Sequence, residues 1–329
     1  MKKNFLKTLL TAGALLSLIA CGGEKKEGAE EKKGDITLTV LTNRTDLAAT
    51  VFPEYAKKFV EANPEVKEVI FESPDDYEGS VKTRMNTKDY GDVLLVPGTM
   101  TNAELPNYFA SLGTVEEVGA TYQGFTKIVD GQVYGIPTSI NVGGTILYNK
   151  EAFAKAGITS FPKNPSELYE ASKKLKAAGI IPLYTNYAAK WPFGQWDGGA
   201  TAAAANQQYK LELVKDSSPF SPGKPYYELY KIMYEMAKNK YIEDDPITSD
   251  WDSSKQMLAD GKVGMMVLAS WAYPQVTALT NNKDSIGLAL FPLPAADGNN
   301  YLPMGGDYNI AINKHSKNID AAKKFIDFF

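Results

Sequence analysis

The sequence predicts an α/β protein made of two lobes, in which helices cover mainly parallel sheets. Short runs rich in β-branched residues alternate with amphipathic segments at helical spacing, which is the pattern of repeated strand–helix units. The chain from Asp35 to Phe329 is also longer than one hydrophobic core usually holds. Alternation and size together therefore favour two α/β lobes over a single domain.

The first predicted unit is a strand followed by a helix. Apolar residues alternate with threonines over residues 36–40, which is the period of a half-buried strand. A helix is expected from Val51, because Phe52 and Phe59 then share one face. Pro53 fits the first turn, where its missing N–H has no intrahelical partner to lose.

Later elements are predicted from the same signals. A helix begins at Pro165 with its small and apolar residues on one side, and Gly179 lies where a C-terminal cap belongs. The last predicted helix begins near Ile319, and we expect the supplied chain to stop inside the fold. Further strands are predicted at residues 66–71, 92–96, 180–184 and 263–268, a glycine-broken apolar run at 135–148, and another helix at 226–237.

Residues 1–20 have the pattern of a lipoprotein signal peptide. Three lysines precede an apolar run from Leu9 to Ile19, which is about half the length that spans a bilayer. Cys21, the only cysteine, follows this run directly, and we expect it to carry a lipid after cleavage. The protein is then expected outside the cytoplasm, anchored to the membrane on the periplasmic or outer-surface side. An ordinary secretory signal is the alternative.

Residues 21–34 predict a charged, flexible tether. After Cys21 they contain no apolar residue larger than alanine, so they cannot bury enough surface to fold. The whole chain has 39 acidic and 35 basic side chains, a net charge of −4. This acidic balance argues against nucleic acid as a partner.

The inventory of reactive residues argues against catalysis. His315 is the only histidine and lies between Lys314 and Ser316, a surface-turn context. With Cys21 assigned to the lipid, neither a nucleophile–histidine pair nor a zinc site of His and Cys is expected. The chain has no Gly-x-x-x-x-Gly-Lys-Ser/Thr phosphate loop, so it is not expected to hydrolyse ATP or to need a cofactor.

Four segments carry a family resemblance. Residues 131–137 (GQVYGIP) followed by 146–151 (ILYNKE) resemble the central signature of the family 1 extracellular solute-binding proteins, the group that contains maltose-binding protein. Residues 191–199, 261–271 and 307–325 are similar to three later segments of that family, in the same order. The resemblance covers nearly everything from Ile36 to Phe329.

The resemblance implies the two-lobe, type II fold of periplasmic binding proteins, with the ligand between the lobes. It assigns residues 35–140 and 289–329 to lobe 1, and residues 141–288 to lobe 2. The chain is expected to leave lobe 1 near residues 139–142 and to return near 288–291. Family members usually continue with further C-terminal helices, which this sequence is expected to lack.

Carbohydrate is the ligand class that the side-chain chemistry favours. Sugars present flat C–H faces and a rim of hydroxyls, so their sites combine aromatic platforms with Asp, Asn, Gln and Arg. The resemblance places Trp191, Trp196 and Trp271 at the cleft, with Trp251 as a further possibility. For each, the alternative is a packing role in the core.

Polar ligand-binding residues are predicted at the ends of strands and at the crossing between lobes. Asn43, Arg44 and Asp46 follow the first strand, at the edge where doubly wound sheets bind ligands. Asn141 lies in the first crossing, although a turn role is equally compatible with it. The remaining predicted site residues are Asp197, Asp307, which alternatively caps a turn, and Tyr77, which rests on resemblance alone.

The function implied is capture of a mono- or oligosaccharide by a monomeric lipoprotein that delivers it to the transmembrane subunits of an ABC importer. A cationic ligand such as a polyamine is the alternative, because aromatic boxes with acids also bind cations. A ligand-sensing lipoprotein receptor is a third reading. A glycosidase remains a remote alternative, if Asp197 and Asp307 face each other across the cleft.

Overall fold

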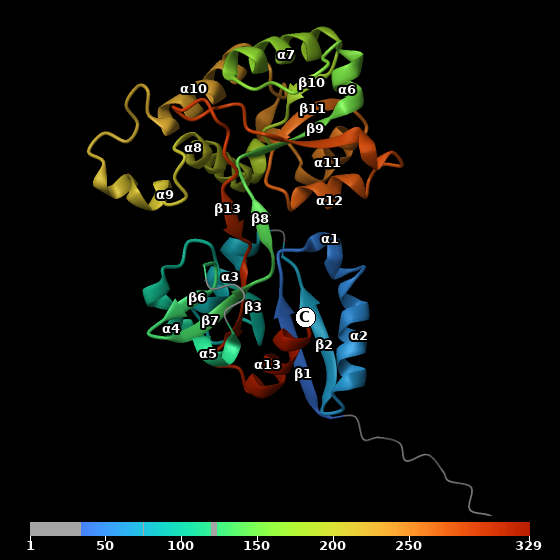
Figure 1. Ribbon diagram of the computed structural model, residues 1–329. Helices are drawn as coiled ribbons and strands as arrows, with labels where there is room; N and C mark the ends of the chain where they lie inside the picture. The colour runs from blue at the N-terminus through green and yellow to red at the C-terminus, as the bar shows by residue number, and fades with distance from the viewer. Residues whose placement is uncertain (1–33, 75, 120–123) are drawn as a thin grey trace, which may run out of the picture.

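A computed structural model describes residues 34–74, 76–119 and 124–329, and it has two lobes joined by a pair of strands (Figure 1). The predicted signal peptide, Cys21 and most of the tether lie outside the described residues. None of the described helices is long and apolar enough to cross a membrane. The two-lobe α/β fold expected from the sequence is confirmed.

The first lobe is built on an eight-stranded sheet with the path β2-β1-β3-β14-β7-β5, in which β4 also pairs with β14 and β6 with β7. Its strands are β1 (Ile36–Leu41), β2 (Val66–Glu72), β3 (Val93–Leu95), β4 (Phe109–Ala110), β5 (Gly113–Thr114), β6 (Lys127–Val129), β7 (Gln132–Pro137) and β14 (Asn309–Asn313). Its helices are α1 (Thr45–Ala48), α2 (Phe52–Ala62), α3 (Tyr77–Met85), η1 (Asn102–Glu104), α4 (Leu105–Tyr108), α5 (Val115–Val118) and α13 (Ile319–Phe328).

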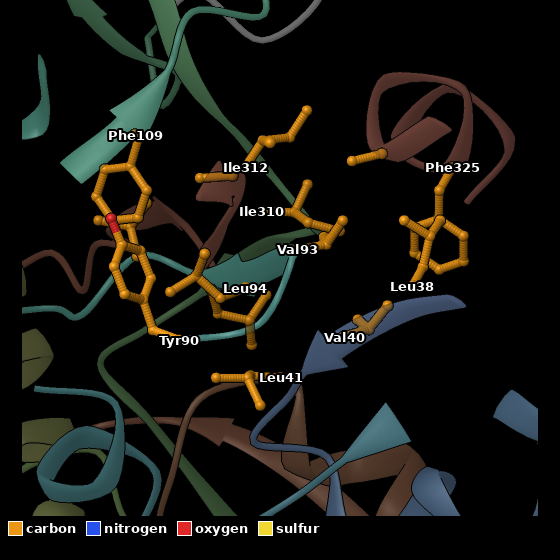
Figure 2. Packing of buried hydrophobic residues seen from close by; sticks show 14 of the residues in the cluster. Leu38, Val40, Leu41, Tyr90, Val93, Leu94, Phe109, Ile310, Ile312 and Phe325 are labelled. Carbon is orange, nitrogen blue, oxygen red and sulfur yellow. The ribbon is translucent and has the colours of Figure 1, made fainter. Parts of the chain in front are cut away.

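The core of the first lobe lies between this sheet and its helices. Figure 2 shows Leu38, Val93 and Ile312 from three neighbouring strands, with Phe325 of α13 beside them. Phe59 of α2 is fully buried and meets Phe325 edge to face, with ring centroids 5.2 Å apart. The aromatic face predicted for α2 therefore packs α2 against the C-terminal helix, and this supports the strand β1 that leads to the cleft.

The second lobe has a four-stranded sheet in the order β10-β11-β9-β12. Its strands are β9 (Thr145–Asn149), β10 (Ile181–Leu183), β11 (Val263–Val267) and β12 (Ile286–Leu290). Its helices are α6 (Lys150–Lys155), α7 (Pro165–Ala177), η2 (Tyr187–Ala189), η3 (Trp191–Trp196), α8 (Asp197–Ala203), α9 (Tyr209–Glu212), η4 (Leu213–Lys215), α10 (Pro225–Lys238), η5 (Pro246–Thr248), α11 (Trp251–Ala259), α12 (Ala272–Thr277) and η6 (Lys283–Ser285).

The sheets are mixed, and the expectation of mainly parallel sheets is wrong. Parallel pairing is confined to β1 with β2 and β3, and to β10 with β11, while the other described pairs are antiparallel. The crossing of the chain between the lobes accounts for the antiparallel pairs of β9 and β14, whereas β5 and β6 pair with β7 within the first lobe. Strands β9 and β14 are the first long strands after a crossing, and each enters its sheet against the direction of its neighbours.

Two short antiparallel strands, β8 (Ile140–Val142) and β13 (Met304–Gly306), join the lobes (Figure 1). The first crossing strand, β8, falls within the residues 139–142 at which the sequence predicted that the chain leaves the first lobe. The return at residues 288–291 is corrected, because β12 pairs with β9 of the second lobe and Phe291 is buried in that lobe's core. The second lobe thus includes residues up to about Pro303, whose carbonyl accepts a hydrogen bond from Gly143 N at 2.8 Å.

Candidate functional site

Three tryptophans of the second lobe contact one another and form what we call the tryptophan platform: Trp191, Trp251 and Trp271. Ring centroids of Trp191 and Trp251 lie 4.8 Å apart in an edge-to-face arrangement, and those of Trp191 and Trp271 lie 5.6 Å apart. Trp191 is 44% exposed, although large aromatic rings are usually buried. An exposed ring supported by two others is available for stacking on a flat ligand.

Each tryptophan of the platform lies at the start of a helix, Trp191 and Trp251 as the first residue and Trp271 as the N-terminal cap. Asp250 caps α11 by accepting from Ser253 N at 2.8 Å, and this fixes Trp251 as the first helical residue. Trp271 Nε1 donates to Gln195 Oε1 at 3.2 Å, which ties α12 to η3. Trp191 follows Lys190, whose φ of +63° is unusual for a residue other than glycine. Such backbone conformations often occur at functional sites.

A polar wall follows strand β1 in the first lobe, as predicted. Arg44 binds Asp46 through two parallel hydrogen bonds, Nε to Oδ1 at 2.8 Å and Nη2 to Oδ2 at 2.7 Å. Burial raises the pKa of Asp46, but the hydrogen bonds and the charge of Arg44 outweigh burial and hold this pKa below its ordinary value. The Asp46 carboxylate, and more weakly that of Asp307, raises the pKa of Arg44. These side chains are thus charged and largely satisfied by one another.

A cavity of about 140 Å³ connects this wall to the crossing strands. Its polar lining includes Asn43, Arg44 and Asp307, and its floor is made of apolar side chains of the first lobe. Three predicted site residues, two from the loop after β1 and one from the segment after β13, therefore share one concave surface.

The crossing strands carry a hydrogen-bond network that reaches both lobes. Asp307 Oδ2 accepts from Ser139 Oγ and from Asn141 Nδ2, both at 3.2 Å. Ser270 Oγ accepts from Val142 N at 3.1 Å and donates to Asn141 Oδ1 at 3.4 Å. Because Ser270 precedes Trp271, this network links the polar wall to the tryptophan platform.

Two predicted site residues lie in the cores instead of at the cleft. Tyr77 is 5% exposed, and its hydroxyl donates to Leu95 O at 2.8 Å and accepts from Leu95 N at 2.7 Å. Trp196 is 4% exposed and meets Phe291 edge to face at 5.5 Å. Trp196 thus has the packing role given as its alternative, and the prediction of Tyr77 from resemblance is corrected, so neither residue belongs to the candidate site.

Asp197 has a different environment from the other predicted acids. Its Oδ2 lies 2.6 Å from Lys210 Nζ, and its charge contributes, after burial, to a raised pKa of Tyr226. Asp307 instead belongs to the crossing-strand network. The two carboxylates have separate partners, which gives no support to a glycosidase pair. Among the described residues, no group of three or more His, Cys, Asp or Glu side chains is arranged to hold a metal ion.

The larger cavity of about 510 Å³ lies elsewhere in the second lobe, between α10 and the segments η2, η3 and η5. Of the predicted site residues, only Trp196 lines it, and the rest of its lining is nearly all apolar. A hydroxyl-rich ligand needs directional polar groups, so this cavity is a poor match for a sugar.

Sequence reasoning missed several residues of the site. The sequence indicates Trp251 only as a further possibility, although the acids on both sides are typical of a helix start. Lys255 and Ser270 carried no sequence signal of their own, because a lysine and a serine usually lie on the surface. Their positions at the platform became evident only from tertiary packing.

Comparison with known proteins places the chain in a family. Residues 45–329 match the model of the family described as bacterial extracellular solute-binding protein, and the chain belongs to this family. Its members are binding proteins of extracytoplasmic location. The protein resembles the diacetylchitobiose-binding protein DasA of Streptomyces coelicolor, with 25% identity over 99% of this chain and 77% of that protein.

Solved structures give the same result. The fold is similar to BlMnBP1, an ABC-transporter binding protein of Bifidobacterium animalis subsp. lactis solved with mannobiose, with 31% identity and a TM-score of 0.80 over 91% of this chain and 73% of that one. Another similar protein is the melibiose/raffinose/stachyose-binding protein MelE of Bacillus subtilis, 24% identical over 100% of this chain and 77% of that protein.

Proposed function

We propose that this protein captures a neutral mono- or oligosaccharide between its lobes and delivers it to the membrane subunits of an ABC importer. The observation that carries the proposal is the exposed tryptophan platform of the second lobe, joined through Asn141 and Asp307 to the polar wall of the first. Aromatic faces suit the C–H surfaces of sugars, and carboxylates and amides suit their hydroxyls. The names of the relatives, which bind mannobiose, diacetylchitobiose and melibiose, support the same ligand class.

The charge arrangement favours a neutral ligand over a polyamine. Asp46 is paired with Arg44, Asp197 with Lys210, and Asp252 beside the platform with Lys255. A polycation would have to displace these internal cations to reach any of the three carboxylates, which leaves only Asp307 of the predicted site acids without a paired cation. Trp251 already has the ammonium of Lys255 5.0 Å from its ring centroid, so it is a poor partner for a second cation.

The route to the membrane is also part of the proposal. We infer that residues 1–20 are removed, that Cys21 receives the lipid, and that residues 21–34 act as a tether holding a monomeric binding protein near its permease. A ligand favours closure only to the extent that it binds the closed form more tightly than the open form. Metabolic labelling with a fatty-acid analogue, in the wild-type chain and in Cys21→Ala, tests the anchor.

The ligand proposal is tested by calorimetry and thermal shift with manno-oligosaccharides, diacetylchitobiose, melibiose and raffinose, and with spermidine as the cationic probe. A sugar that binds the folded state raises the melting temperature. We expect at least one sugar to bind the wild type and to lose most of its affinity in Trp271→Ala. Binding of spermidine alone would overturn the carbohydrate assignment.

A further inference from the structure

Lys255 is a buried ammonium beside Trp251 of the tryptophan platform. It lies on α11, and only 8% of its side chain is exposed. Its Nζ is 2.7 Å from Asp252 Oδ1, 3.4 Å from Gln275 Oε1 of α12, and 5.0 Å from the ring centroid of Trp251. A buried charge is costly, so its retention calls for a compensating interaction.

The partners within its own lobe neutralise Lys255 incompletely. The side chain of Asp252 is 71% exposed, so water screens much of its charge. The contact with Gln275 is long for a hydrogen bond, and a ring face contributes only modestly. Positive potential therefore remains around Lys255.

Asp46 belongs to α1 of the first lobe. Helices α11 and α12 are on the side of the second lobe that faces α1 (Figure 1). Burial raises the pKa of Asp46, but Arg44 lowers it, and the charge of Lys255 adds a smaller lowering effect. The side chain of Asp46 is 28% exposed, so it remains accessible to a second cation.

We propose that Asp46 and Lys255 form an interlobe ionic contact that strengthens when the lobes close, which makes Lys255 a positioning residue for ligand binding. The inference rests on the proposed function. In this structure Asp46 is bound by Arg44 and Lys255 by Asp252. Closure shortens the distance between Asp46 and Lys255 and excludes water, and both changes strengthen their attraction. Only this gain on closure contributes to ligand affinity.

A double-mutant cycle tests the contact, with the affinity of the bound sugar measured for Asp46→Asn, Lys255→Met and the double variant. We expect each single change to weaken binding about three- to tenfold, and the double variant to be no weaker than the worse single variant. The coupling should shrink in about 0.5 M salt, and Lys255→Arg should restore it. The control is the pair Glu65 and Lys324, an ion pair within the first lobe at 2.5 Å, whose cycle should show no coupling in affinity.

The interlobe contact and the proposed sugar binding can fail separately. Additive losses in folded variants would overturn the interlobe contact while leaving the proposed function intact. If Lys255→Met does not fold, the salt dependence of binding by Asp46→Asn decides, because a dependence equal to that of the wild type would also overturn the contact. Failure of the wild type to bind any sugar would overturn both.

Discussion

The two walls of the cleft differ in how far they are prepared for a ligand. On the second lobe, the rings of the tryptophan platform are held by contacts with each other and by the bond from Trp271 to Gln195. On the first lobe, Arg44 and Asp46 already satisfy one another. A ligand that stacks on the platform displaces water only, whereas a hydroxyl at the polar wall must replace an existing hydrogen bond. We therefore expect the platform to supply most of the affinity and the polar wall to supply discrimination.

The largest effect is predicted for Trp271→Ala. This change removes one stacking ring and the support it gives to Trp191 and Trp251. Loss of about 100 Å² of apolar contact corresponds to about 2 to 3 kcal/mol, or roughly 30- to 150-fold in Kd. Isothermal titration calorimetry with the sugar that binds the wild type measures it.

Trp196→Phe is the matched control for that variant. Trp196 lies in the core against Phe291, so we expect its change to lower the free energy of unfolding by about 1 to 3 kcal/mol and to leave Kd within about twofold. Equal losses of affinity in both variants would contradict a specific role for the platform.

Asp307→Asn is predicted to have the next largest effect, about tenfold in Kd. The substitution keeps the shape of the side chain but removes the charge that strengthens its bonds to a hydroxyl and to Asn141. Asp197→Asn is the comparison, because Asp197 is engaged by Lys210 away from the crossing strands, and we expect it to change Kd less than twofold. If Asp197→Asn weakened binding more than Asp307→Asn, the polar part of the binding site would lie at α8.

Local sequence signals predicted the helices better than they predicted the site. Helix α7 begins at Pro165, and its buried residues are the four expected from spacing: Leu168, Ala171, Ser172 and Leu175. Gly179 follows it with φ of +74°, as a C-terminal cap requires. These features depend on neighbours within one or two turns, which the sequence displays directly.

The failures involve contacts between distant segments. Trp191 and Trp196 lie in one short helix, yet Trp191 is exposed beside Trp251 and Trp271 whereas Trp196 is buried against Phe291. Residues 288–291 look like a crossing strand, but they complete the sheet of the second lobe. Composition and spacing do not distinguish these outcomes, because they depend on which distant segments of the chain each side chain contacts.

A smaller effect is predicted for pH through Asp46. Its pKa in the folded protein is below the ordinary value of 3.8, so its contribution to stability is fully present above that value and is lost as the pH falls through the lowered pKa. The pair with Arg44 is partly exposed, so we expect a contribution of about 0.5 kcal/mol. Melting temperatures of the wild type and Asp46→Asn should differ at pH 6, and the difference should shrink as the pH falls below 3.8. A difference that does not change with pH would contradict an ionic origin.

Tyr77→Phe should leave the affinity for the ligand unchanged, and it therefore tests whether the binding site extends into the core of the first lobe. The change leaves a buried backbone N–H and C=O of Leu95 without their partner, which should lower the free energy of unfolding by about 1 to 3 kcal/mol. Kd should stay within about twofold, because the hydroxyl lies inside the first lobe. Tyr55→Phe, on the exposed side of α2, controls for the loss of a phenol and should change neither quantity. Denaturant unfolding and calorimetry on the same samples measure both. A tenfold loss of affinity in Tyr77→Phe would extend the polar wall through β3 into the core, and would mean that the ligand senses the packing of the first lobe as well as its surface.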